Sequence, residues 1–351
     1  MSGRPGNTAV RAFRGFGSGR RVYVSGQVIT GRGAEVAAPA SRHRRRDLGK
    51  RLLDALRLAV SRRVVGARVR VECGDASEVV EADSHGFFAA CLEVAPARED
   101  GPWRGYRAEL VAPAAAAPAR GEGEVLMATA ASRRVVVSDI DDTVMHTGVA
   151  NKLMMLWRLF THGAEDRAPL PGVAAFYRGL HGGREGDEEN PPVYVSRSPW
   201  AIYPVLEAFF HDHEIPAGPV LELRDWGISL RHPFPRRARQ HKREVLERVF
   251  EVFKDLPIVL VGDSGQRDPE VYAAIARRYP ERVAAIYIRD LLHSADRSAA
   301  LRRMQESLGE LDVDLVLAAS TAEMAVHARR RGWIPDSTVT EVREHVAREV
   351  P

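Results

Sequence analysis

The sequence predicts an α/β protein in which a small all-β domain precedes a larger domain built on a parallel sheet. Residues 21–131 contain short alternating apolar segments separated by glycine and aspartate turns, a pattern typical of antiparallel strands. Residues 132–335 instead alternate short, continuous apolar runs with longer amphipathic segments, as expected for strands that helices cover on both faces. The first of these apolar runs, residues 135–137, leads directly into a cluster of acidic residues.

The composition is that of an ordinary soluble globular protein. The chain has 351 residues, of which 45% are hydrophobic and 28% charged, and this length accommodates two domains. The formal net charge of +4 permits binding of anionic substrates but does not require nucleic acid. Cys73 and Cys91 are the only cysteines, which excludes a disulfide framework and zinc-ligand spacing.

The sequence shows no pattern of membrane insertion or export. No apolar run approaches the roughly 20 residues that cross a bilayer. The N-terminus has charged residues and glycines but no apolar segment of the signal-peptide type. We therefore expect a cytoplasmic protein with at most peripheral contact with a membrane.

The first 131 residues are predicted to form a flexible tail followed by a β-sandwich-like domain. Residues 1–20 are rich in glycine and arginine and offer little to bury, so we expect a flexible N-terminal tail. Alternating patterns over residues 21–131 predict strands near residues 22–29, 68–73, 78–82, 87–94, 103–111 and 124–130. One inserted helix is expected over residues 47–61, because Leu48, Leu52 and Leu56 recur at helical spacing.

A run of basic residues at positions 42–51 leads into this predicted helix. Two interpretations stay open. The run contacts anionic lipid head groups, which attract a basic side chain by about 1 kcal/mol, or it forms a solvated loop in an arginine-rich protein.

Residues 132–335 are predicted to form the second domain, and residues 336–351 a C-terminal helix. After the first run, apolar runs predict strands near residues 193–196, 219–223, 258–261, 283–288 and 315–318. Helices are predicted near residues 171–180, 199–213, 240–253, 323–330 and 340–349, with another beginning at Pro269. A further predicted helix, residues 149–160, is apolar nearly all round, so it either lies in the core or meets lipid.

Polar and charged residues occur where three of the apolar runs end. Asp139 and Asp141 follow the first run, and their spacing of two places both on one side of an extended chain. Two carboxylates that face one pocket repel each other unless a cation lies between them or one holds a proton. Ser196 ends the second run and Asp263 the third, while Lys242 lies on the predicted helix between them. Because open α/β sheets bind ligands at the carboxyl ends of their strands, we expect these residues to form one site.

This set of residues suits phosphoryl transfer through an aspartate. Asp139 is the candidate nucleophile, and Asp141 is the candidate acid that protonates the leaving alkoxide and then accepts a proton from water. A magnesium ion, which prefers hard oxygen ligands, would be held by Asp139, Asp263 and the main-chain carbonyl near Asp141, with Asp268 binding through water. The candidate residues that bind the substrate phosphate are Thr143, Ser196 and Lys242.

The order of these motifs resembles that of haloacid dehalogenase (HAD) superfamily phosphatases. The motifs are Asp-x-Asp-x-Thr at residues 139–143, the strand-end Ser196, Lys242, and Gly-Asp-x4-Asp at residues 262–268. Within this superfamily, residues 135–290 resemble the catalytic domain of actin-patch-protein-type phosphatidate phosphatases. The segments that carry this second resemblance are residues 138–143, 196–200, 223–225, 241–242, 262–272 and 286–290.

The resemblance implies a fold, a reaction and a partner. The fold is a HAD-like Rossmannoid parallel sheet with a small cap, since residues 144–192 leave no room for a large one. The implied reaction of this phosphoric monoester hydrolase is the Mg²⁺-dependent conversion of phosphatidate to diacylglycerol through an aspartyl-phosphate. The implied partner is phospholipid at a membrane surface, and nucleic acid is not expected.

Two alternative functions stay open beside this one, and a third is set aside. The first is a HAD phosphatase for another phosphomonoester. The second is a catalytically dead, membrane-binding adaptor, which the presence of every charged site residue disfavours. The third, a chymotrypsin-like protease, is suggested by residues 262–265, which resemble the nucleophile segment of such enzymes. It is set aside because that site requires a β-barrel, whereas this segment lies between a predicted strand and a predicted helix of an α/β pattern. Arg224 and Arg289 either bind substrate phosphate or form structural ion pairs.

Overall fold

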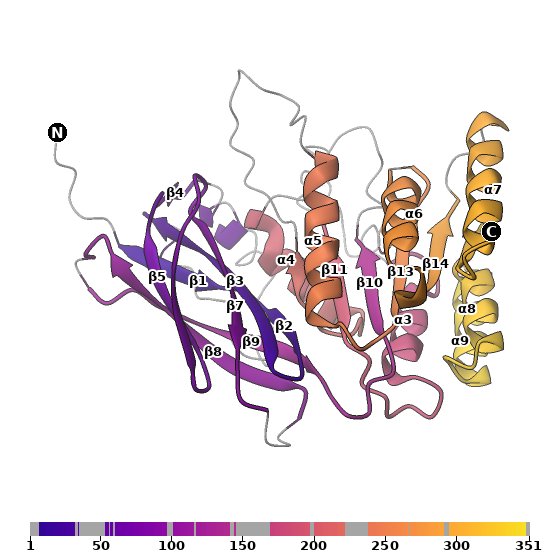
Figure 1. The fold of residues 1–351 in the computed structure, drawn as a ribbon, viewed down its shortest axis with the longest axis horizontal. Coiled ribbons are helices and arrows are strands. Elements are labelled where there is room, and N and C mark those ends of the chain that lie inside the picture. Colours follow the sequence, from indigo (N-terminus) through magenta and orange to yellow (C-terminus); the bar gives the residue numbers. More distant parts are fainter. Residues whose placement is uncertain are drawn as a thin grey trace. The chain divides into compact units, whose positions relative to one another are not determined.

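The computed structural model describes residues 7–31, 34, 53–55, 57–58, 60–96, 101–115, 117–140, 144, 169–196, 200–221, 238–265, 267–290 and 295–348. The chain divides into two compact units (Figure 1). The first comprises Met1–Thr129, Pro199–Ala208 and Leu223–Gly227, and the second comprises Ala130–Ser198, Phe209–Glu222 and Ile228–Pro351.

Some of the sequence predictions fall outside the described residues. They concern Asp141, Thr143, Arg224, the basic run at residues 42–51 and the apolar helix at residues 149–160.

The first unit is built on antiparallel strands. Its nine described strands form one hydrogen-bonded sheet in the order β1-β3-β2-β9-β8-β5-β6, and β4 and β7 also pair with β3. The pairs are antiparallel except β2 with β9, which is parallel. The strands are β1 (Thr8–Ala12), β2 (Gly15–Ser18), β3 (Arg21–Thr30), β4 (Arg62–Arg63), β5 (Arg68–Cys73), β6 (Ala76–Glu81), β7 (Phe87–Glu93), β8 (Trp103–Ala112) and β9 (Arg120–Ala128).

Alternating buried side chains build the core of this unit. In β5, Val69, Val71 and Cys73 are fully buried, whereas Arg70 and Glu72 between them are partly exposed. These side chains join those of other strands in one apolar cluster. The strands predicted near residues 68–73 and 87–94 are thus confirmed. Of the helix predicted over residues 47–61, residues 53–55 and 57–58 are helical, whereas residues 60 and 61 are not.

The predicted flexible tail over residues 1–20 is wrong for residues 8–18, which form β1 and β2 and pair with β3. Phe16 is completely buried in this region. Gly15, one of the glycines that suggested flexibility, serves close packing instead, because a Cβ at this position would lie 2.3 Å from the carbonyl oxygen of Tyr23. The glycine at position 15 therefore allows the close approach of β2 and β3.

A segment far along the chain also belongs to the first unit. The 3₁₀ helix η3 (Trp200–Ile202) and the first half of α4 (Tyr203–Asp212) replace the single helix predicted over residues 199–213. Trp200 stacks on Phe13 with a distance of 3.5 Å between ring centroids, and Arg14 forms an ion pair with Glu207 at 2.8 Å. The predicted second domain of residues 132–335 does not anticipate these contacts.

The second unit contains a parallel sheet. Its six described strands follow the order β12-β11-β10-β13-β14-β15, and each neighbouring pair is parallel (Figure 1). The strands are β10 (Val135–Asp139), β11 (Pro192–Val195), β12 (Val220–Leu221), β13 (Ile258–Asp263), β14 (Val283–Arg289) and β15 (Asp314–Ala318). Every residue of β10, β11 and β13 is buried, as the continuous apolar runs predict for strands covered on both faces.

The helices of this unit form two packed groups. The chain moves across the sheet in one direction from β10 to β12 and in the other direction from β12 to β15. Because connections between parallel strands are generally right-handed, helices in these two parts of the chain are expected on opposite faces of the sheet. Accordingly α3 packs with α8 and α9, while α6 packs with α5 and α7. The helices are α3 (Val173–Gly182), α5 (Ala238–Val252), α6 (Asp268–Arg278), the short η4 (Pro280–Arg282), α7 (Ala295–Gly309), α8 (Thr321–Arg330) and α9 (Asp336–Arg348).

Helix α7 has no counterpart in the sequence prediction. Of its side chains, Leu301 and Leu308 are fully buried, and seven positions separate them. Two buried leucines at that spacing give too weak an apolar stripe to indicate a helix.

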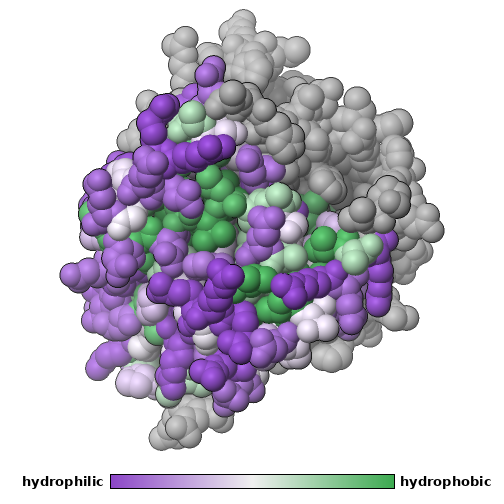
Figure 2. All heavy atoms as spheres, turned by 90° about the vertical axis from the view of Figure 1, so that its right-hand side faces the viewer, coloured by the Kyte–Doolittle hydropathy of each residue, from purple (hydrophilic) through white to green (hydrophobic). Residues whose placement is uncertain are grey.

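The side of the molecule on which α7, α8 and α9 lie, at the right of Figure 1, is largely hydrophilic, with apolar side chains in small separate patches (Figure 2). None of the helices described here has the length and apolar character that crossing a bilayer requires.

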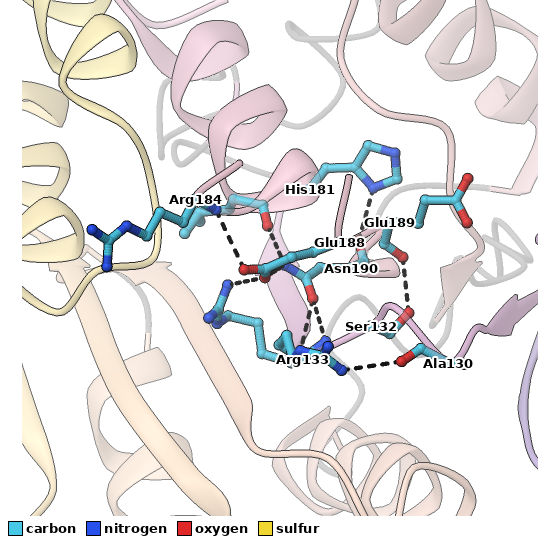
Figure 3. A network of polar contacts seen from close by, with 10 residues as sticks. Ala130, Ser132, Arg133, His181, Arg184, Glu188, Glu189 and Asn190 are labelled. Atoms are coloured by element: carbon cyan, nitrogen blue, oxygen red, sulfur yellow. Dashed lines mark hydrogen bonds and ion pairs between the residues drawn. The ribbon is translucent and has the colours of Figure 1, made fainter. Parts of the chain in front are cut away.

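A network of hydrogen bonds around Asn190 fixes the beginning of β10 (Figure 3). The Oδ1 atom of Asn190 accepts hydrogen bonds from the main-chain nitrogens of Arg133 (2.8 Å) and Arg134 (3.0 Å). Its Nδ2 atom donates to the carbonyl oxygen of Leu180 (2.8 Å) and to Oε2 of Glu188 (2.7 Å). Asn190 is completely buried, so one side chain joins the end of α3 to the start of two neighbouring strands.

Replacing this side chain should destabilise the second unit. Asn190→Ala leaves several buried main-chain groups without partners, and we expect the free energy of unfolding to fall by about 3 kcal/mol. Chemical denaturation measures this change, with Asp187→Ala at an exposed position of the same loop as the control. A loss as small as that of the control would contradict the role of Asn190.

Candidate active site

The site lies where two adjacent strands of the parallel sheet end. Asp139 is the last residue of β10, and Asp263 is the last residue of β13. From β10 the chain continues to β11 and β12 on one side, and then returns to β13 on the other side. Such a reversal of strand order opens a crevice at the carboxyl ends of the strands, which is where α/β sheets of this kind bind ligands.

Three carboxylates converge at this point. Oxygen atoms of Asp139, Asp263 and Asp268 all lie within 4.8 Å of one another. The first two side chains come from strand ends, and Asp268 is the first residue of α6. All three residues are at most 1% exposed, so their mutual repulsion is only weakly screened by water.

Lys242 of α5 binds two of these carboxylates. Its Nζ atom donates to Oδ1 of Asp139 at 2.7 Å and to Oδ1 of Asp268 at 2.6 Å, and the residue is 4% exposed. Burial alone would lower the pKa of Lys242, but the charges of Asp139 and Asp268 outweigh it and raise that pKa well above its ordinary value. The lysine therefore favours its charged form, and its hydrogen bonds orient both carboxylates.

Gly262 and Tyr272 complete the surroundings of Asp268, and the sequence reasoning missed both roles. A Cβ at Gly262 would lie 2.6 Å from Oδ2 of Asp268, so only glycine allows Asp268 this close to β13. The hydroxyl of Tyr272 donates to the carbonyl oxygen of Val261 at 3.1 Å, and its ring centroid lies 5.4 Å from Nζ of Lys242. The only available signals were the glycine before Asp263 and the helical spacing of four between Asp268 and Tyr272.

The loop after β13 is anchored to the next strand. The hydroxyl of Ser264 donates to Oδ1 of Asp290 at 3.0 Å, and its main-chain nitrogen donates to the carbonyl oxygen of Arg289 at 2.9 Å. Arg289 itself is 8% exposed and donates from Nη2 to the hydroxyl of Thr321 at 2.5 Å. Burial lowers the pKa of Arg289.

Four of the seven predicted site residues lie together in the described structure: Asp139, Lys242, Asp263 and Asp268. Ser196 is completely buried and directly follows β11, in which Val195 is in register with Asp139 of β10. It therefore lies at the same edge of the sheet as the cluster. Asp141 and Thr143 are outside the described residues.

The donor set fits a hard divalent cation. The three carboxylates and Lys242 together carry a formal excess of negative charge, which a divalent cation would neutralise. Oδ2 of Asp268 is buried and has no hydrogen-bond partner in the described part of the chain. A buried carboxylate oxygen in that condition is costly unless a cation binds it.

Comparison with known proteins identifies the segment that carries this site. Residues 134–290 match the family model described as phosphatidate phosphatase APP1, catalytic domain. The chain is 32% identical over 159 residues to an uncharacterized protein of Schizosaccharomyces pombe, covering 45% of this chain and 25% of that protein. It is 30% identical over 155 residues to the phosphatidate phosphatase APP1 of Saccharomyces cerevisiae, covering 44% and 25%.

These relatives are much longer than the matched region, and the chain spans about a quarter of their length. Among solved structures, a carbohydrate acetylesterase from Xanthomonas citri is similar over 86% of this chain and 66% of its own. Its sequence identity of 12% and TM-score of 0.30 are too low to inform fold or function. The family match and the two relatives agree that residues 134–290 of this chain are similar to phosphatidate phosphatase APP1 catalytic domains.

Proposed function

We propose that this chain is a magnesium-dependent phosphatase that hydrolyses phosphatidate to diacylglycerol at a membrane surface. The observation that carries the proposal is the buried cluster of three carboxylates and Lys242 at the reversal of strand order. Its position inside the family-matched segment of residues 134–290 supports a phospholipid substrate. The finer fold assignments belong to the same proposal: a HAD-like Rossmannoid core with a small cap, and a β-sandwich-like first unit.

The acidic cluster is assigned to the metal. Asp139, Asp263 and Asp268, together with the main-chain carbonyl near Asp141, would hold Mg²⁺. When bound, Mg²⁺ supplies positive charge that offsets the charge of the phosphate oxygens.

Asp139 is assigned as the nucleophile. Lys242 binds Oδ1 of Asp139 and so fixes the orientation of the carboxylate, and we assign the attack on phosphorus to Oδ2. This forms an oxygen–phosphorus bond to Asp139 and breaks the bond between phosphorus and the glycerol oxygen. The leaving alkoxide takes a proton from Asp141 and departs as the hydroxyl of diacylglycerol.

Water then completes the cycle. Asp141 accepts a proton from the water that attacks phosphorus, the bond to Asp139 breaks, and inorganic phosphate leaves. Lys242, Ser196 and Thr143 are assigned to the phosphate oxygens throughout. Because the pKa of Lys242 is raised, the lysine stays charged and donates hydrogen bonds without exchanging its proton.

The substrate class is tested by phosphate release. We expect faster release from phosphatidate in mixed micelles than from soluble phosphomonoesters at equal Mg²⁺ concentration, and no release when the metal is chelated. Asp139→Asn, prepared in the same way, controls for contaminating phosphatases. A clear preference for soluble esters would reject the lipid substrate and retain a phosphatase, whereas turnover that survives chelation would reject the metal site.

Gly262→Ala tests the geometry of the cluster. The added methyl group would meet Oδ2 of Asp268 at 2.6 Å and displace it, and we expect the turnover number to fall by about 100-fold. Steady-state kinetics measure the change. Gly182→Ala is the control, because a Cβ at that position in α3 meets nothing within 4 Å. Equal activity of the two variants would contradict the requirement for glycine at position 262.

A further inference from the structure

Arg297 of α7 binds the loop that connects two members of the acidic cluster. Its guanidinium forms a two-pronged contact with Glu270, through Nη1 to Oε1 and through Nη2 to Oε2 at 3.3 Å. Nη2 also donates to the carbonyl oxygen of Ser264 at 3.3 Å. Arg297 lies beyond residues 134–290, so the family match does not include it.

The two contact points flank the loop closely. Ser264 directly follows Asp263, and Glu270 lies in the first turn of α6, two residues after Asp268. One guanidinium therefore spans the connection between the two carboxylates. Because α7 is a separate helix packed on α6, Arg297 holds this spacing from outside the loop itself.

The side chain of Arg297 is positively charged. The hydrogen bond with Glu270 raises the pKa of Arg297, and the nearby charges of Asp263 and Asp290 raise it further against the effect of burial. The side chains of Arg297 and Glu270 are 21% and 44% exposed, so the pair contributes little to global stability. The main effect of this ion pair is therefore on the local geometry of the loop between Asp263 and Asp268.

We propose that Arg297 is a positioning residue that sets the separation and orientation of Asp263 and Asp268, and thereby the affinity of the cluster for Mg²⁺. The inference rests on the proposed function, because it takes the cluster as the metal site. Removing a residue that orients metal ligands typically lowers the metal affinity by about 10- to 100-fold.

If Arg297 positions the loop, its removal should weaken Mg²⁺ binding, whereas if it acts only through its charge, its removal should strengthen that binding. Its positive charge lies near Asp263 and repels a cation, so by charge alone its loss would strengthen Mg²⁺ binding. If Arg297 holds the loop, its loss lets the two carboxylates separate and weakens binding. The direction of the change therefore distinguishes the two effects.

The test measures Mg²⁺ binding by the rise in thermal unfolding temperature across a Mg²⁺ titration, without substrate. We expect Arg297→Met to raise the Kd for Mg²⁺ about tenfold or more, and Glu270→Gln to raise it in the same direction. The double variant should bind Mg²⁺ no more weakly than Arg297→Met, because both substitutions remove the same contact between Arg297 and Glu270. Arg297→Lys should bind Mg²⁺ more tightly than Arg297→Met but more weakly than the wild type, because lysine keeps the positive charge but cannot make the two-pronged contact of a guanidinium.

Arg302→Met, at an exposed position of the same helix, is the matched control. Unchanged or tighter Mg²⁺ binding in Arg297→Met and Glu270→Gln would overturn the inference and leave the proposed function intact. If Arg297→Met does not fold, Arg297→Lys decides the outcome, because it keeps the positive charge and changes only the geometry of the contact. A wild-type chain that Mg²⁺ does not stabilise would overturn the metal site of the proposed function and the inference together.

Discussion

The buried hydrogen bonds from Lys242 to Asp139 and Asp268 are the interaction on which the site depends. Carboxylates withdrawn from water repel one another, and burial strengthens that repulsion. Lys242 offsets part of it, and because it lies on α5 it also joins that helix to the end of β10 and the start of α6. The negative charge that the lysine does not neutralise is the property on which the proposed metal site rests.

The order of the strands explains how residues distant in sequence reach this cluster. Asp139 and Asp263 are far apart in the chain, yet β10 and β13 are neighbours because the chain crosses the sheet between β12 and β13. The absence of a side chain at Gly262 then lets Asp268 approach β13. The sheet supplies the rough position of each carboxylate, whereas local contacts determine the final geometry.

The sequence predicted the parts of the molecule that local patterns determine. Continuous apolar runs ending in Asp139 and Asp263 indicated parallel strands with acidic ends, and the structure brings those ends together. The same reasoning misread Gly15 as a sign of flexibility, because the strand that contains it, β2, also pairs with the distant strand β9. It also missed α7 and with it Arg297, since no pattern in one sequence shows which loop a surface arginine contacts. Roles that depend on tertiary contact needed the structure.

Trapping a phosphoenzyme tests most directly whether Asp139 is the nucleophile of this cluster. Protein mixed with Mg²⁺ and phosphatidate micelles is quenched in acid, digested and examined by mass spectrometry, and Asp141→Asn is included to slow the release of phosphate. The account predicts a phosphate on the peptide that contains Asp139, dependent on Mg²⁺ and missing from Asp139→Asn. Phosphate bound to a different residue, or turnover that persists in Asp139→Asn, would contradict it.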